Sequence, residues 1–190
     1  MKKTILILLM VLMASSVFAY TNASFGIGAD IYFNSENDEF GDTKDSYSNI
    51  KIIGSIMLDT VEVAPYFKFS TTKQYDTGNL VDKYGEWGFG SLFHIPVLTT
   101  EVITLGPGLD VGVGFGTFDD EFYTDISAFS FYTTFPLIMD VSLGAFVFRI
   151  SQNIGGFHHD SFKAGTLKYT ESTFYFENGF GPRFGFLYTF

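Results

Sequence analysis

Hydrophobic and polar residues alternate along most of the chain, most clearly near its end. Between Phe174 and Phe190 the even-numbered positions are mostly aromatic, and the odd-numbered positions carry mainly glycine, charged and smaller residues. Residues two apart share a face of a β-strand, so this segment is predicted to be a strand with one aromatic face. The segment 105–116 repeats the pattern, with bulky residues opposite glycines and Asp110.

The alternation predicts eight strands, and the segments between them are of two kinds. Three connections are short and four are long and polar. A meander with this order puts the long loops at one end and the short turns, with both termini, at the other. The expected strands are 24–33, 50–58, 61–70, 84–95, 105–116, 126–137, 141–151 and 174–190, the short turns are 59–60, 96–101 and 138–140, and the long loops are 34–49, 71–83, 117–125 and 152–172.

The choice of buried face separates a soluble barrel from a membrane barrel. A soluble barrel keeps its apolar face inside, which here would force most of the 24 Phe into a small lumen and leave a bare glycine surface outside. With the opposite facing, Phe, Leu, Val and Ile meet lipid, and small and charged groups fill the lumen. The prediction is therefore all-β: an eight-stranded antiparallel up-and-down transmembrane β-barrel with short periplasmic turns and four long external loops.

The first 19 residues are predicted to be a signal peptide. A basic start at Lys2 and Lys3 precedes an unbroken apolar run from Ile5 to Met13, and small residues lead to Ala19. The run is too short to cross a bilayer, which takes about 20 residues. We therefore expect cleavage after Ala19, export from the cytoplasm, and a barrel formed by residues 20–190.

The composition excludes several classes of protein. The chain has a net charge of -10, is 46% hydrophobic, and contains no Cys. The apolar content excludes a disordered acidic tail, and the scarcity of basic clusters argues against nucleic acid as a partner. The absence of Cys excludes disulfides, thiolate metal sites and a cysteine nucleophile. No cofactor is expected.

The last strand carries the most specific resemblance to a known group of proteins. Its alternating aromatics, Phe184, Phe186, Tyr188 and Phe190, are similar to the terminal signal that the outer-membrane assembly machinery recognises. The segment 92–112 also resembles a hairpin of generic outer-membrane barrels. From residue 20 onward the chain resembles the small eight-stranded barrels that include the OmpA membrane domain, OmpX and Ail. This resemblance implies a monomer in the outer membrane, with lipid and the assembly machinery as partners.

The inward faces of the predicted strands carry charged residues that must pair or be hydrated. The alternatives are a network of ion pairs and water that plugs the lumen, and a lining that selects a small permeant. Inward glycines of 105–116 leave room that tyrosines could fill, and the facing of 141–151 is ambiguous, with a bulge near Gly144 as one solution. The predicted lumen network is Asp30, Lys51, Glu62, Lys68, Glu86, Asp110, Glu177 and Arg183.

Two of the long loops concentrate negative charge. The loops 34–49 and 117–125 hold nine of the 21 acidic residues and, with Lys44, a net charge of -8 out of the -12 of the exported chain. A solvated surface explains them, and the alternative is a divalent-cation site at Asp119, Asp120 and Glu121, which lacks the spacing of known calcium loops. No metal ligands are predicted.

Catalysis would need a base beside a nucleophile, and the only candidates for the base are three histidines. His94 is expected to fill the lumen. His159 and Ser161 share a face if extended, a spacing like that of lipid A deacylases, but they fall in a predicted loop rather than on a strand at the lipid boundary. We therefore predict no catalytic residues and no enzyme activity.

The resulting hypothesis is a non-enzymatic outer-membrane barrel that displays its loops for adhesion or envelope structure, with a host or cell-surface ligand as a partner. The alternative is a narrow pore or carrier for small hydrophobic molecules, as in the OmpW-like group. A lipid A modifying enzyme is the third hypothesis.

Removal of Phe190 is expected to impair assembly into the outer membrane, because the terminal aromatic residue completes the alternating signal of the last strand. The measurement is the fraction of protein that becomes heat-modifiable on gels after expression with its leader. Insertion of the truncated chain at the normal level would contradict the role given to this strand.

Overall fold

The computed structural model describes residues 23–37, 43–58, 60–76, 79–119, 126–176 and 182–190, and these form ten strands. Among them, no helix is long and apolar enough to span a membrane. The strands are β1 (Ala23–Asn37), β2 (Thr43–Leu58), β3 (Val61–Asp76), β4 (Asn79–His94), β5 (Leu98–Thr99), β6 (Ile103–Asp119), β7 (Ile126–Leu143), β8 (Phe146–Ala164), β9 (Leu167–Phe176) and β10 (Arg183–Thr189).

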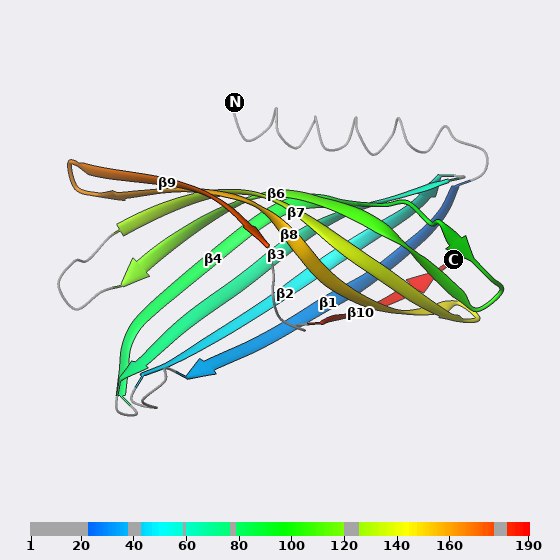
Figure 1. The fold of residues 1–190 in the computed structure, drawn as a ribbon, viewed down its shortest axis with the longest axis horizontal. Coiled ribbons are helices and arrows are strands. Elements are labelled where there is room, and N and C mark those ends of the chain that lie inside the picture. Colours follow the sequence, from blue (N-terminus) through cyan, green and yellow to red (C-terminus); the bar gives the residue numbers. More distant parts are fainter. Residues whose placement is uncertain (1–22, 38–42, 59, 77–78, 120–125, 177–181) are drawn as a thin grey trace.

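The strands form one antiparallel sheet that closes on itself (Figure 1). Neighbours follow the chain from β1 to β4, then through β6, β7 and β8. β8 pairs with β10 along its first part and with β9 along its second, and β10 also pairs with β1. β9 and β10 thus share the eighth position of the ring, and β5 is a short addition to β6. The predicted eight-stranded antiparallel up-and-down barrel is confirmed.

Most strands are longer than predicted and take up much of the polar segments expected to be loops, whereas the single strand predicted at 174–190 is wrong, because its described residues divide between the end of β9 and β10. β1 and β2 remain paired as far as Asn37 and Lys44, and β3 and β4 as far as Asp76 and Asn79. The expected loop 152–172 is instead a hairpin of β8 and β9 that turns at Gly165 and projects beyond the barrel (Figure 1). Where both faces of a strand are polar, the period-two signal disappears, so these boundaries were misplaced.

The turn predicted at 138–140 is wrong, because β7 continues to Leu143. Ile138 and Asp140 are buried on the inward face, and the chain reverses at Gly144, whose φ of 65° suits a tight turn.

The bulge expected near Gly144 lies elsewhere. The register of β7 and β8 shifts between Phe135 and Pro136, which leaves Ile154 unpaired. Proline has no N–H to donate to the ladder, so a bulge is favoured at that point.

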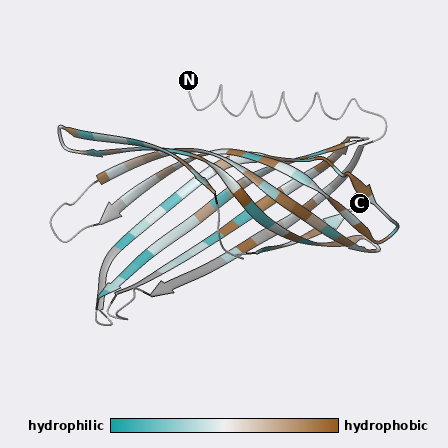
Figure 2. Cartoon of the chain, viewed as in Figure 1, coloured by the Kyte–Doolittle hydropathy of each residue, from teal (hydrophilic) through white to brown (hydrophobic). Residues whose placement is uncertain are grey.

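The facing of the wall follows the prediction. Aromatic side chains such as Phe69, Trp87 and Phe148 are about half exposed on the outside, whereas Glu62 and Asp110 are almost fully buried inside. Figure 2 shows the resulting alternation of hydrophobic and hydrophilic positions along the strands. The facing of the segment 141–151 follows the same rule, because Phe146 and Phe148 of β8 face outward and Arg149 faces inward.

Aromatic rings on neighbouring strands contact one another across the outer surface. The ring of Trp87 on β4 lies 6.1 Å from Phe67 and 5.0 Å from Phe115, centroid to centroid, and Phe115 lies 5.5 Å from Phe129. Such cross-strand pairs stabilise adjacent strands by roughly 0.2–1 kcal/mol each. The outer surface is therefore a continuous aromatic layer over β3, β4, β6 and β7.

Gly28→Ala is expected to weaken the β1–β10 seam. A Cβ at Gly28 would overlap the carbonyl oxygen of Phe186 and lie 2.8 Å from the Cα of Leu187. Neither backbone atom can move without opening the ring, so we expect a loss of about 2 kcal/mol in the free energy of unfolding. Urea titration of the folded barrel measures it. Gly85→Ala is the control, since nothing lies within 4 Å of a Cβ there, and equal losses in both variants would contradict the analysis.

Candidate functional site

The interior of the barrel holds a cluster of four ionisable side chains at the end near the β7–β8 turn. The register brings them together in two facing pairs: Glu62 of β3 lies opposite His94 of β4, and Asp140 of β7 lies opposite Arg149 of β8. All four are buried. The cluster therefore follows directly from strand pairing and inward facing.

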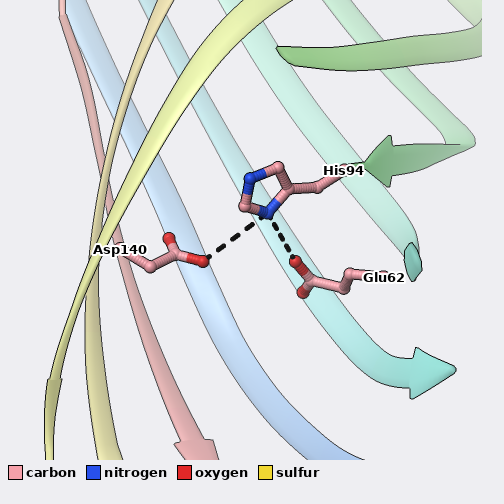
Figure 3. A group of neighbouring side chains, drawn as sticks. All are labelled: Glu62, His94 and Asp140. Carbon is pink, nitrogen blue, oxygen red and sulfur yellow. Dashed lines mark hydrogen bonds and ion pairs between the residues drawn. The ribbon is translucent and has the colours of Figure 1, made fainter. Parts of the chain in front are cut away.

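Arg149 links the two acids of this cluster. Its Nε donates to Asp140 Oδ1 at 2.8 Å, and its Nη2 donates to Asp140 Oδ2 at 2.7 Å and to Glu62 Oε2 at 2.5 Å. Nδ1 of His94 lies 3.3 Å from Glu62 Oε2 and 3.8 Å from Asp140 Oδ2 (Figure 3). Since both neighbours of Nδ1 are carboxylate oxygens, this nitrogen carries the proton and donates. Ser55 Oγ donates to the second oxygen of Glu62.

The described residues contain one group of potential metal ligands, which consists of Glu62, His94 and Asp140. Their ligand atoms lie within 4.8 Å of one another. The guanidinium of Arg149, however, already lies on the carboxylate oxygens that face His94. A metal ion would have to displace a buried cation from both acids at once. The donor set therefore fits an ion-pair network better than a metal centre.

A second layer lies farther along the lumen and is built around Asp110 of β6. Lys51 Nζ lies 2.5 Å from Asp110 Oδ2, and the hydroxyl of Tyr66 donates to Oδ1. The Tyr66 hydroxyl also lies 2.8 Å from that of Tyr132. The Lys51 ammonium is 4.1 Å from the centre of the Tyr66 ring, a cation–π contact.

A third layer is built around Glu86 of β4. Lys68 Nζ lies 2.5 Å from Glu86 Oε1, and the hydroxyls of Tyr84 and Ser130 donate to Oε2 at 2.9 and 2.8 Å. Lys68 also lies 3.9 Å from the centre of the Tyr132 ring, which connects this layer to the second. Each described lumen carboxylate of the three layers thus has at least one cationic partner.

Inward glycines make room for the tyrosines of these layers. A Cβ at Gly112 of β6 would overlap the hydroxyl of Tyr132, and one at Gly90 of β4 would overlap that of Tyr66. At Gly116 the obstructing side chain would be Tyr84. The space that the sequence left open beside 105–116 is therefore occupied by tyrosine rings from β3, β4 and β7.

The structure brings five of the eight predicted lumen residues together inside the barrel. Arg183 lies half-buried, 5.4 Å from the ring centre of Tyr32. Asp30 is opposite Lys51 in the register, but its side chain lies outside the described part, as does all of Glu177. The five are Lys51, Glu62, Lys68, Glu86 and Asp110.

Sequence reasoning missed Asp140 and Arg149. The alternation predicts a turn at Asp140 and does not determine the facing of Arg149. The sequence does contain a signal for both residues. Asp140 and Arg149 lie at nearly equal separations along the chain from Gly144, so a hairpin that turns at this glycine pairs them. His94 was expected to fill the lumen, and the structure adds that Glu62, on the neighbouring strand, is its acid partner.

The aromatic residues predicted as an assembly signal lie on the outer face of β10 and beyond its end. Phe186 packs against Phe146 and Phe148 of β8, with centroid distances of 5.5 and 5.2 Å, and Tyr188 lies 5.2 Å from Phe146. Phe190 is exposed and contacts Tyr188. These rings cover the seam where β10 closes the ring. Recognition by the assembly machinery stays a prediction.

The histidines of the β8–β9 hairpin face opposite sides. His158 faces the lumen, 6.3 Å from the ring of Tyr132 and 3.3 Å from Asp160. His159 faces outward, and its Nδ1 is hydrogen-bonded to Ser172 Oγ at 2.7 Å rather than to Ser161. No carboxylate belongs to the described outward face of this hairpin, so the third member of a catalytic triad is missing there.

Arg149→Met is expected to lower the free energy of unfolding by about 3–5 kcal/mol, because it leaves two buried carboxylates without their cation. The measurement is the urea midpoint of the barrel in lipid vesicles. In the matched variant, Glu62→Gln, Asp140→Asn and Arg149→Met are combined, which removes the charges together and should cost much less. A triple variant as unstable as the single one would contradict the ion-pair account.

No protein-family model matches the chain, and no curated protein matches its sequence. Among solved structures, Neisserial surface protein A (NspA) aligns over 89% of this chain and 99% of its own, with a TM-score of 0.53 and 13% identity. Two other structures are less similar. A major outer membrane protein from Thermus thermophilus aligns over 89% of this chain and 100% of its own, with a TM-score of 0.45 and 11% identity. Ail of Yersinia pestis aligns over 88% of this chain and 97% of its own, with a TM-score of 0.39 and 12% identity. The likeness to NspA shows that the chain has the fold of the small eight-stranded outer-membrane barrels.

Proposed function

We propose that the chain is an integral outer-membrane protein whose barrel is closed inside and whose outer end, including the β8–β9 hairpin, meets partners at the cell surface. The proposal rests first on the facing of the wall. Phe, Leu, Ile and Trp cover the outside of a closed sheet, which suits lipid, and backbone groups find partners around the ring. A soluble protein would instead expose a large apolar surface to water.

The filling of the interior supports a structural barrel over a pore. Three successive layers of ion pairs and hydroxyls cross the lumen, centred on Arg149, Asp110 and Glu86. Tyrosine rings fill the positions opposite the inward glycines. An eight-stranded barrel encloses little more than its own side chains, and these layers support a lumen closed to solutes.

The role at the cell surface is supported by the strand extensions. A strand of about 9–11 residues crosses a bilayer, whereas β8 has 19 residues and β3 has 16. The excess of β8 pairs with β9 in a two-stranded hairpin, and the residues of β9 are almost all exposed. We propose adhesion or envelope structure as the role, assembly by the outer-membrane machinery, a monomeric state and no enzymatic activity.

Conductance in planar bilayers tests the closed interior. The wild-type barrel is expected to give no stable single-channel currents, and the double variant Tyr66→Ala, Tyr132→Ala is expected to open steady currents, because it removes two rings that fill the lumen. Tyr169→Ala on the exposed hairpin is the control and should remain silent. Stable currents from the wild type, blocked by changes at Lys51 or Lys68, would establish a pore in place of the closed barrel.

A further inference from the structure

The second and third layers of the lumen share one arrangement. In each layer a lysine ammonium contacts both a carboxylate and the face of a tyrosine ring, and hydroxyl groups donate to the same carboxylate. The lysine supplies the positive charge that a buried carboxylate needs, and the ring attracts the same cation. The two sets are Lys51 with Asp110 and Tyr66, and Lys68 with Glu86 and Tyr132.

Farther toward the outer end of the lumen, carboxylates occur without a lysine. Asp160 of β8 is opposite Glu171 of β9 on the inward face, and it is also opposite Ser130, which belongs to the third layer. Like charges at directly opposed positions destabilise a sheet. Within the described residues, neither acid has a lysine or an arginine at ion-pair distance. His158 lies 3.3 Å from Asp160, but it carries a positive charge only when it is protonated.

The surroundings of Asp160 show the missing charge. A bilayer takes about 9–11 residues of a strand, so Asp160, far along the 19 residues of β8, lies beyond the membrane-spanning part. Burial raises the pKa of its carboxyl above the ordinary value, and the carboxylates of Glu86 and Glu171 act in the same direction. His158 and His159 act in the opposite direction but do not cancel this effect. A cation beside Asp160 would therefore stabilise its charged form.

The basic residues of this end of the barrel do not supply that cation. Arg183 of β10 faces the lumen, but its guanidinium lies over the ring of Tyr32, 5.4 Å from the ring centre. The facing of a strand position is fixed by the alternation, so a lysine on the outer face cannot reach the lumen. The lysines with described side chains here all stand on the outer face, and they are Lys73, Lys83, Lys163 and Lys168.

A buried amide at the same end of the lumen also lacks a partner. The side chain of Asn49 of β2 faces inward, and the residue is only 6% exposed. Its Nδ2 donates to the hydroxyl of Tyr47 at 3.1 Å, whereas its Oδ1 accepts from no described group. Buried polar atoms are nearly always hydrogen-bonded, and a carbonyl oxygen can only accept. The partner that Asn49 lacks is therefore a hydrogen-bond donor.

Tyr84 of β4 connects the amide to the acids. Its hydroxyl donates to Glu86 at 2.9 Å, at the upper side of the third layer. Both Asp160 and Tyr47 act electrostatically on this hydroxyl, and Tyr47 is in turn affected by Glu86. The orphaned oxygen of Asn49, the tyrosines and the acids thus border one region above the third layer, which we call the outer mouth.

We propose that the outer mouth binds a linear polyamine that enters from the outer end of the barrel. One ammonium group lies between Asp160 and Glu171, and another donates to Oδ1 of Asn49. The rings of Tyr47 and Tyr84 line the path between them, as tyrosines line the lysines of the lower layers. The ligand thus supplies the ammonium that this level lacks. Such a ligand goes beyond the surface role proposed above, because it occupies the lumen and not the tip of the hairpin.

A single metal ion fits the outer mouth less well than an extended organic cation. A metal site needs ligand atoms that converge on one point, and the described residues provide such a group only at Glu62, His94 and Asp140, at the other end of the lumen. The acceptors of the outer mouth are instead spread over β2, β8 and β9. A flexible chain with separate ammonium groups can reach them one by one, and each ammonium offers several N–H donors.

Isothermal titration calorimetry of the folded full-length barrel in a non-ionic detergent tests the proposal, with spermidine as the probe. The wild type is expected to bind a single spermidine, more weakly as salt is added. Asp160→Asn should weaken binding at least about tenfold and Asn49→Leu about fivefold, because each removes an acceptor for a charged donor. Glu101→Gln removes one acid from the exposed turn at the other end of the barrel and should bind like the wild type.

A second measurement keeps folding and binding apart. The heat-dependent gel shift shows whether each variant is folded, so loss of binding by a shifted barrel is loss of the site. Spermidine should raise the thermal midpoint of the wild type and of Glu101→Gln, because it binds the folded state, and should leave that of Asp160→Asn nearly unchanged. Absence of binding by the folded wild type, or unchanged affinity of Asp160→Asn, would overturn the polyamine site.

Three further probes test the chemistry of the ligand. Magnesium chloride that displaces spermidine at equal concentration would overturn the organic cation in favour of a metal ion. A spermidine analogue with every nitrogen fully methylated keeps the charges but has no N–H to donate, so equal affinity would refute the contact with Asn49. A trilysine peptide that binds more tightly than spermidine would overturn the small ligand in favour of a protein partner.

Discussion

Closure of the hydrogen-bonded ring is the constraint on which the rest of this structure depends. In hydrocarbon no water is present to satisfy an open strand edge, so a sheet must pair its last strand with its first. Here β10 makes that closure, and glycine at position 28 permits the close approach of β1. Once the ring is closed, each strand has one face toward the outside and one toward a narrow lumen, and the sequence can only distribute residues between the two.

That distribution explains the unusual composition. The aromatic residues gather outside, where large rings pack across strands, and the inner face takes glycines wherever a tyrosine from another strand crosses the lumen. Charged groups inside have no bulk water to solvate them and so pair with one another in layers. Lys51 and Lys68 are used in this way, while the other lysines whose side chains are described stand on the outer face.

The fold and the facing of the wall could be predicted because both depend on a period of two, which the sequence displays directly. The lumen network could be predicted only where strand boundaries were correct, as for Glu62, Asp110 and Glu86. Asp140 and Arg149 were missed because the turn was placed too early, before Gly144 rather than at it. The β8–β9 hairpin was missed for another reason: near its tip the alternation is short, with Phe162 and Ala164 on one strand and Leu167 and Tyr169 on the other, and the polar residues around them are typical of a loop. The bulge at Ile154 depends on the opposite strand, where Pro136 interrupts the ladder, and no local pattern could reveal it.

The buried ion pairs contribute more to the choice of register than to net stability. Removing two charges from water costs several kcal/mol per ion, and pairing them offsets that cost only with good geometry. A shift of one residue between β7 and β8, however, would turn Arg149 toward lipid and Phe148 toward the lumen. Arg149 would then lose both carboxylates at once, because Asp140 and Glu62 come from different strands and meet only in this register. An apolar lumen would tolerate the shifted pairing far better. We infer that the polar interior is retained because it makes one pairing of the strands much more stable than its neighbours.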